Sequence, residues 1–316
     1  MSAADISTSD ESTRAVKPPR RWYQFRLRSL LILMAILSVP LAWLGHELRL
    51  RWAEERSVSI VKASGGSVEF EYFQRLKVPE EHGFEVRLGE LREQTRWEAW
   101  KDRRLGPRVY VVDYHITDGV VQDLAPLAAF DRLQLLDISD VRISNLAALT
   151  PLDRLAVLFV TRANVDDWSA LSTLPNLQTA ILAETNFDDL AILSPLRQLE
   201  NLVIDLPKGA NLAPLADLKR LRWLRLKNVR SKDLASLGEL RQLEGLLILD
   251  SSIDDISAIA RLTNLKRAVF KNVAVAGEIL VGIHHPKHVA DEHEQLQALR
   301  KALPDCSIAV PLNLTP

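Results

Sequence analysis

Residues 171–192 read LSTLPNLQTAILAETNFDDLAI, and the same pattern of apolar residues returns at a constant spacing on both sides, as from Leu149 to Leu171 to Leu193. Four apolar columns continue through eight units, beginning at Leu105, Val111, Tyr114 and Ile116 and ending at Ile259, Leu265, Ala268 and Phe270. Within each unit, apolar residues alternate over a few positions, as in a short strand with one buried face. A fixed period over eight units indicates a solenoid, in which each coil buries its apolar face against the next.

A fifth column of the repeat holds only aspartate or asparagine. Side-chain oxygens of these residue types cap the first N–H groups of a helix, so we expect a helical turn to begin here on the outer side of each coil. A column of solvated polar groups is the alternative interpretation. The seven members are Asp123, Asn145, Asp167, Asp189, Asn211, Asp233 and Asp255.

The units resemble the 22-residue class of leucine-rich repeats, which is seen in internalin-type bacterial surface proteins. The resemblance covers about residues 105–273 and implies an α/β solenoid with parallel strands on a concave face and short helical turns on the convex face. A basic leader, one apolar run and a repeat array also resemble the single-pass, membrane-anchored repeat proteins of some bacteria. The period already predicts a solenoid. The resemblance adds its family and the membrane-anchored arrangement of the chain.

This chain departs from the family where the repeats carry an inner asparagine ladder. We expect Thr185 and Ser251 to replace it in two coils, and backbone or water contacts to close the other turns. The unit that starts at Leu193 has Pro207, Lys208 and Gly209 in place of the usual turn, which predicts a bulge in that coil. The ladder positions are Gly119, Val141, Ala163, Thr185, Pro207, Val229, Ser251 and Val273.

Residues 29–45, SLLILMAILSVPLAWLG, contain no acidic or basic residue and are followed by three arginines, Arg49, Arg51 and Arg56. A helix of this length covers about 25 Å, slightly less than a bilayer core. We interpret it as an uncleaved signal anchor, which Pro40 can kink, with a cytoplasmic N-terminus and the repeats outside the cytoplasmic (inner) membrane. A cleaved signal peptide or a buried core helix are the alternatives. The six bases that precede the run are Arg14, Lys17, Arg20, Arg21, Arg26 and Arg28.

Composition changes then divide the chain. We expect a strand at Val68, Phe70 and Tyr72, a cap that carries Trp97 and Trp100, and a C-terminal helix that starts with a capping box at Asp291 and Glu294, followed by a last strand through Cys306. The predicted parts are 1–28, a basic cytoplasmic tail; 29–45, a transmembrane helix; 46–66, a juxtamembrane helix and linker; 67–104, an N-terminal cap; 105–273, eight repeats; and 274–316, a C-terminal cap with a histidine-rich insertion.

Bulk composition excludes several classes of function. A net charge of −1 excludes a globally basic nucleic-acid binder, so we expect no nucleic-acid ligand. The single cysteine, Cys306, cannot form an internal disulfide, and we expect it to be a small core residue. The sequence carries no phosphate loop, C-x-x-C pair or nucleophile elbow, so we predict neither an enzyme nor a cofactor.

The one group of residues with ligand chemistry is a histidine cluster near the C-terminus, His284, His285, His288 and His293. Imidazoles at this spacing can bind a transition metal. Pro286 forces an extended backbone between them, however, and a solvated loop has the same composition. We therefore predict no metal site.

Strand alternation identifies the side chains that leave the concave sheet. In the first unit we expect Asp113, His115 and Thr117 to lie beside Leu135, Asp137 and Ser139. An apolar stripe in the middle and basic residues with a tryptophan beyond it are typical of a protein or peptide interface. The alternative is that strand propensity alone explains the apolar residues. The predicted binding residues are Leu135, Val157, Phe159, Ile181, Val203, Trp223, Arg225, Lys227, Arg267 and Lys271.

These features predict a membrane-anchored binding module that presents its concave face to a protein or peptide. The alternative is a structural envelope protein, which would associate with itself or hold an anionic polymer through Trp223 and its basic neighbours. Fold alone does not choose between them, because repeat solenoids have many kinds of partner.

Overall fold

The computed structural model describes residues 27–69, 95, 96, 98, 101, 109, 111–115, 123–207, 209–279 and 293–310. The chain divides into two compact units, Met1–Arg49 and Leu50–Pro316, which are described separately. The predicted strand positions Phe70 and Tyr72, and the tryptophans Trp97 and Trp100, lie outside the described residues.

A single helix, α1 (Leu27–Ala63), starts in the first unit and continues through Pro40. Leu31, Ile36 and Val39 on it are more than half exposed. By length and composition, Leu31–Ala63 is suited to cross a membrane, with a mean hydropathy of 1.7 over its most apolar window. An apolar helix near the N-terminus fits either a signal anchor or a signal peptide.

The last turns of α1 belong to the second unit and pack on the solenoid. Val61 is fully buried in its core, and Glu54 Oε1 accepts the N–H of Val109 at 2.5 Å. The helix ends where Gly66 N–H donates to the Val61 carbonyl, with Gly65 at φ +90°. A left-handed residue just after the last turn is a common helix stop, and glycine adopts this conformation without strain. Strand β1 (Ser67–Glu69) follows and pairs antiparallel with β2.

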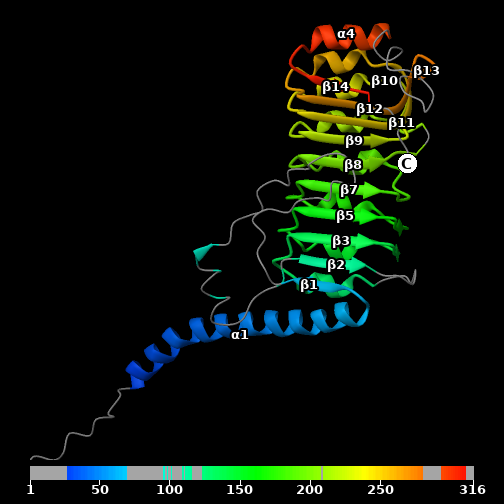
Figure 1. The fold of residues 1–316 in the computed structure, drawn as a ribbon. Helices are drawn as coiled ribbons and strands as arrows, with labels where there is room; N and C mark the ends of the chain where they lie inside the picture. Colours follow the sequence, from blue (N-terminus) through cyan, green and yellow to red (C-terminus); the bar gives the residue numbers. More distant parts are fainter. Residues whose placement is uncertain are drawn as a thin grey trace, which may run out of the picture. The chain divides into compact units, whose positions relative to one another are not determined.

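The second unit is built on a stack of parallel strands, visible in Figure 1. Each strand bonds to the strand one coil further along the chain, because the strand repeats once per coil. The strands that form this stack are β2 (Val111–His115), β3 (Leu135–Ser139), β5 (Val157–Thr161), β7 (Thr179–Ala183), β8 (Asn201–Asp205), β9 (Trp223–Lys227), β11 (Gly245–Asp255) and β12 (Arg267–Val275).

The four apolar columns form the core, as predicted. From the second unit to the eighth, the members of all four columns are at most 4% exposed. Phe270, at the end of the last column, is completely buried. Burial at every turn of the solenoid explains why the period is kept without insertions over these units.

The predicted register of the first unit is wrong. Val111 pairs with Leu135, and not with Leu133 as the repeat columns require. Asp113 therefore lies beside Asp137 in the sheet. Several apolar residues alternate in this first strand, so the sequence pattern fits both registers, and pairing with β1 and β3 decides between them.

The aspartate and asparagine column caps the outer turns, as predicted. In the six members whose side chains are described, one oxygen accepts the N–H two residues further on, at 2.7–3.0 Å. The turns are short 3₁₀ helices, in which few residues must be fixed. They are η2 (Ala125–Ala129), η3 (Ala147–Leu149), η4 (Ser169–Thr173), η5 (Leu190–Leu193), η6 (Ala213–Asp217), η7 (Ala235–Glu239) and η8 (Ser257–Arg261).

The inner turns close without an asparagine ladder. Ser251 Oγ accepts the N–H of Val229 from the preceding coil at 2.9 Å, as expected, whereas Thr185 bonds only weakly, at 3.4 Å, within its own coil. Backbone pairs close other turns, including Asn164 N–H to the Val141 carbonyl at 3.0 Å. Six turns place a non-glycine residue at positive φ, a feature that the sequence did not predict: Asp140, Arg162, Glu184, Asn228, Asp250 and Asn272.

The unit that starts at Leu193 differs only in its turn. Its strand β8 keeps the regular register with β9, so the predicted bulge does not displace the strand. The positive φ moves to Gly209, at +77°, after Pro207. Lys208 lies outside the described residues.

The C-terminal end is closed by α4 (Glu294–Ala302) and β14 (Ser307–Ala309), which pairs parallel with β12. The helix begins directly after His293, whose side chain makes no cap bond, and Asp291, on which the predicted capping box depends, lies outside the described residues. Gln295 instead joins α4 to the last coil: its amide accepts from Ile256 N–H and donates to the Asp254 carbonyl, both at 3.0 Å. Cys306 is half-buried against the core, as expected.

Four further short strands complete the sheets of the described residues. β10 (Arg230–Asp233) pairs with β11, and β13 (Glu278–Ile279) pairs antiparallel with β12. β4 (Arg142–Ile143) and β6 (Asn164–Val165) form a separate pair on the turn side. At the far side of β6, the carboxamide of Asn186 both accepts from and donates to the backbone of Val165, at 2.9 Å each. The Asn186 side chain therefore makes the hydrogen bonds to β6 that a third strand would make.

Candidate binding surface

The parallel register brings the predicted binding residues onto one face of the sheet. Leu135, Val157, Thr179, Asn201, Trp223, Gly245 and Arg267 are successive cross-strand partners in one column. Phe159, Ile181, Val203, Arg225, Leu247 and Val269 form the next column. Lys227 and Lys271 lie in a third, with Leu249 between them.

The predicted apolar stripe is not exposed. Leu135, Val157, Ile181 and Val203 are 1–4% exposed, so the expectation of a free apolar surface is wrong for these four residues. Ile181 and Val203 pack with Ala183 and Leu247 in a second apolar cluster, separate from the main core. Strand alternation predicts which side chains leave the sheet but not what lies over them.

The accessible part of the face lies toward the C-terminal coils. Phe159, Trp223, Arg225 and Lys227 are half-buried. Arg267 and Lys271 are exposed on β12. Leu249 and Val269 are also half-buried and pack against the second cluster. The basic and aromatic half of the predicted site is therefore the half that a partner can reach.

Trp223 lies over the backbone of the next coil. A Cβ atom built on Gly245 would come within 2.1 Å of Trp223 Cε3 and 2.2 Å of Cζ3. Any side chain at position 245 would therefore displace the indole ring, and glycine is required for its present position. The half-buried indole ring is a flat apolar surface in the middle of the accessible part of the face.

Arg225 projects from the same strand into partly apolar surroundings. Burial lowers the pKa of its guanidinium, while the nearby carboxylates of Asp205, Asp250 and Glu184 act in the opposite direction. Asp205 Oδ2 accepts the backbone N–H of Glu184 at 3.0 Å and lies 3.9 Å from Lys227 Nζ. The face thus combines an aromatic ring, a desolvated guanidinium and apolar neighbours.

A buried polar pair lies between the stripe and this accessible part. Asn201 Nδ2 donates to Thr179 Oγ1 at 2.9 Å, and both residues are almost fully buried. Strand alternation places both residues in one column of the concave face but does not predict their bond. The sequence could have indicated this bond, because Thr179 and Asn201 are two polar residues that occupy the same position in successive coils.

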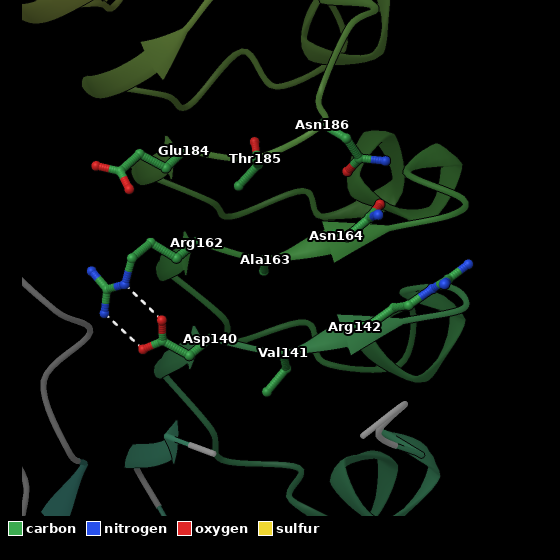
Figure 2. A pocket seen from close by; sticks show the side chains of 9 residues that line it. All are labelled: Asp140, Val141, Arg142, Arg162, Ala163, Asn164, Glu184, Thr185 and Asn186. Atoms are coloured by element: carbon green, nitrogen blue, oxygen red, sulfur yellow. Dashed lines mark hydrogen bonds and ion pairs between the residues drawn. The ribbon is translucent and has the colours of Figure 1, made fainter. Parts of the chain in front are cut away.

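A shallow hollow of about 610 Å³ lies along the turn side of three coils. Figure 2 shows Val141, Ala163 and Thr185 among its lining residues, with charged residues around them. Arg162 donates to both carboxylate oxygens of Asp140, at 2.6 and 2.7 Å, and this contact raises the pKa of Arg162. The hollow exists because Val141, Ala163 and Thr185 are small side chains at the position where the family carries its asparagine ladder. It is open to solvent, and its cation Arg162 is already paired with Asp140.

Coils of constant length, each with one parallel strand on the inner side and a capped 3₁₀ turn on the outer side, define the architecture. The chain is a leucine-rich-repeat solenoid. The sequence matches no family model and no curated protein.

Among solved structures, the solenoid is similar to internalin C2 of Listeria monocytogenes, with 22% identity and a TM-score of 0.47 over 64% of this chain and 81% of that chain. An internalin (inlF) of the same organism has 18% identity and a TM-score of 0.42, over 61% of this chain and 64% of that one. The plant peptide hormone receptor RGFR1, in complex with RGF2, has 13% identity and a TM-score of 0.41, over 60% and 30%. Similarity at this level concerns the fold alone, and the coil geometry itself carries the assignment.

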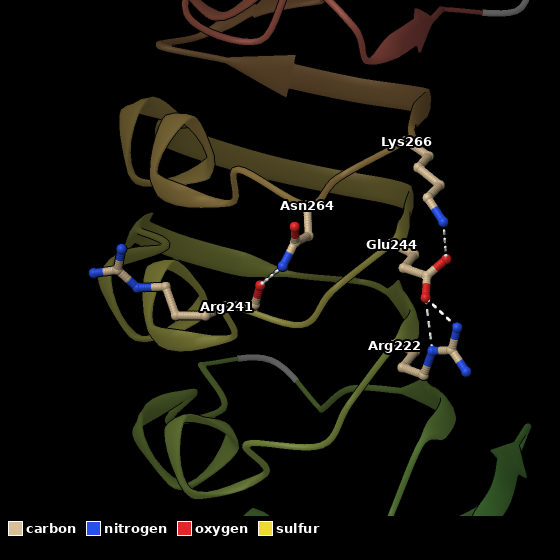
Figure 3. Close-up of polar contacts among 5 residues, drawn as sticks. All are labelled: Arg222, Arg241, Glu244, Asn264 and Lys266. Carbon is tan, nitrogen blue, oxygen red and sulfur yellow. Dashed lines mark hydrogen bonds and ion pairs between the residues drawn. The ribbon is translucent and has the colours of Figure 1, made fainter.

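On the opposite edge of the leucine-rich-repeat sheet, charged side chains join successive coils just before β9, β11 and β12. Glu244 binds Arg222 of the preceding coil and Lys266 of the following coil, the latter at 2.6 Å (Figure 3). The bond from Lys266 lowers the pKa of Glu244, with Arg222 acting in the same direction against burial. Beside them, Asn264 Nδ2 donates to the Arg241 carbonyl at 2.8 Å. These contacts connect the repeats and have a structural role.

Glu98 attaches the segment before the repeats to the coil of β5. Its carboxylate bonds Arg154 at 2.7 Å and accepts both the N–H and the hydroxyl of Thr95 at 2.9 Å. Burial raises the pKa of Glu98, but the bonds from Thr95 and Arg154 outweigh it and lower the pKa to about 2. Thr95 and Glu98 form a capping box, which the T-x-x-E pattern in the sequence could have indicated.

Three of the four clustered histidines, His284, His285 and His288, lie outside the described residues. In the part of the chain that the structure describes, no group of three or more His, Cys, Asp or Glu side chains could hold a metal ion. The prediction about this cluster stays a prediction.

Proposed function

We propose that this leucine-rich-repeat chain is a non-catalytic binding module, which holds a protein or peptide partner on the accessible part of its concave face. The observation that carries the proposal is the half-buried pair Trp223 and Arg225 on one strand, next to exposed Arg267 and Lys271. Tryptophan and arginine are the residue types that most often dominate binding energy when they are partly desolvated.

Within this proposal the ten predicted residues have different roles. Leu135, Val157, Ile181 and Val203 are buried and form the base under the contact surface. Phe159 and Trp223 supply the apolar contact, because both are large, aromatic and partly accessible. The four basic residues set charge complementarity and the rate of association.

We also propose that α1 anchors the chain with its N-terminus in the cytoplasm and its repeats outside. Six basic residues precede the apolar run and three follow it closely, interleaved with acidic residues. The exposure of Leu31, Ile36 and Val39 favours a lipid environment, since a core helix of a soluble protein would bury them.

The function is tested by selection from a phage-displayed library of random dodecapeptides on the full chain in detergent. Trp223→Ala and Phe159→Ala should each weaken a selected peptide by about 5- to 100-fold, equivalent to about 1–3 kcal/mol. The matched control is Trp52→Ala, which removes an exposed indole from α1. If a natively folded Phe159→Ala/Trp223→Ala double variant binds the same peptides unchanged, the concave face is not the site.

The structural alternative rests on exposed Arg267 and Lys271, which are suited to an anionic polymer. Binding of this kind depends on total charge, so Arg267→Gln should weaken binding of polyglutamate at least as much as Arg225→Gln does. Polyglutamate binding that falls in Arg267→Gln, together with no selected peptide, would favour this alternative.

A further inference from the structure

Arg225 occupies an unusual position for a charged residue. Its cross-strand partners are Val203 on β8 and Leu247 on β11, and both are buried in the second apolar cluster. On its own strand it is flanked on the same face by Trp223 and Lys227. Every other member of its column from Phe159 to Val269 is apolar.

The guanidinium does not donate all the hydrogen bonds that its burial demands. Nε and Nη1 of Arg225 are shielded from solvent, and no residue within the described ranges accepts a bond from either. Asp205, the carboxylate that acts most strongly on Arg225, is turned elsewhere: its Oδ2 accepts the Glu184 N–H and faces Lys227. Oδ1 of Asp205 is also shielded, with no donor among the described residues.

A shielded charge without a hydrogen-bond partner destabilises the folded chain, and an apolar residue of similar volume would fit this column better. The coil geometry does not need an arginine, because the core columns lie on the other side of the sheet. A cost that the fold does not require is typical of a binding site, where the ligand supplies the missing countercharge.

We propose that Arg225 recognises an acidic side chain of the peptide partner, next to an apolar side chain that packs on Trp223. This rests on the proposed function and names the chemistry of its ligand. An oxygen of a carboxylate can accept a bond from Nη2, the guanidinium nitrogen that is not shielded from solvent, and its negative charge offsets the desolvated positive charge. Trp223, Leu249 and Val269 form the half-buried apolar border of the same surface, and this border suits an aliphatic or aromatic neighbour in the peptide.

The exposed bases on β12 add to the selectivity without sharing this role. Arg267 is open to water, so its charge is screened and its hydrogen bonds are made by solvent. A carboxylate gains more at Arg225, where water is excluded from two of the three nitrogens. Arg267→Gln is therefore a matched control, since it removes the same charge from the same face.

The experiment selects random dodecapeptides on three full-length proteins in detergent: the wild type, Arg225→Gln and Arg267→Gln. We expect wild-type peptides to be enriched in aspartate or glutamate beside an apolar residue, and the Arg267→Gln pool to lose much less of this enrichment than the Arg225→Gln pool. On Arg225→Gln, acidic residues should fall to their frequency in the library while the apolar preference remains. Thermal unfolding checks that both variants are folded.

A double-mutant cycle gives the decisive number. Replacing the selected glutamate by glutamine should weaken binding to the wild type at least about tenfold, and to Arg225→Gln less than about twofold. Peptides that need Trp223 but carry no acidic residue would overturn this inference and leave the proposed function standing. Equal losses on both proteins would also overturn it. If no peptide is selected at all, both the inference and the proposed function fail.

Discussion

Leu177 tests the repeat register most directly. It is completely buried, and Leu155 and Leu199, one coil away on either side, are at most 1% exposed. Leu177→Ala removes about three carbon atoms, which corresponds to about 2.4 kcal/mol of transfer free energy at roughly 0.8 kcal/mol per methylene. The adjacent coils are fixed by strand bonds on both sides, so the site cannot collapse and a cavity contribution is added. We expect a total loss of about 3–5 kcal/mol.

The assay is thermal unfolding of the full chain in detergent, monitored by circular dichroism. For a domain of this size, each kcal/mol lowers the Tm by about 2–4 °C, so the expected shift is about 6–20 °C. Leu177→Asp should be worse still, because it adds an unpaired charge to the same cavity. The control is exposed Arg197→Ala, which should change the free energy of unfolding by less than about 0.5 kcal/mol. Equal Tm values for Leu177→Ala and Arg197→Ala would refute the register.

Three further predictions concern the cap column, the N-terminal contact and topology. Asn145→Ala removes the acceptor for Ala147 N–H and should cost about 1 kcal/mol in urea unfolding, whereas Asn145→Asp should cost almost nothing; equal costs would exclude capping. Glu98→Gln should cost up to about 3 kcal/mol at neutral pH, since the depressed pKa means that the carboxylate's contribution is present above pH 4.5 and is lost as the pH falls toward 2. A pH-independent difference between wild type and Glu98→Gln would contradict this. With the proposed orientation, a phosphatase reporter fused after Pro316 lies outside the cytoplasm and should be active there. Reporter activity in the cytoplasm would reverse the proposed orientation.

The sequence predicted the solenoid because the repeat is a local rule that is applied many times. The Leu177 column needs an apolar residue at every turn, and the Asn145 column needs a side-chain oxygen, so both requirements are written once in every repeat. Where the repeat is irregular, the sequence was insufficient. The first strand offers two acceptable apolar registers, and only its pairing with β1 and β3 selects Val111 beside Leu135.

The binding surface shows the same division. Strand alternation placed Trp223 and Arg225 on one face from the sequence alone, since side-chain direction along a strand has a period of two. It could not predict that Val157 and Ile181 are buried, because burial depends on groups distant in the chain. Nor could it show that Gly245 makes room for the Trp223 ring, or that Asp205 turns away from Arg225 toward Lys227 and the Glu184 backbone. Periodicity determines where each side chain points, whereas distances between atoms of different coils decide what it touches, and those distances exist only in the folded chain.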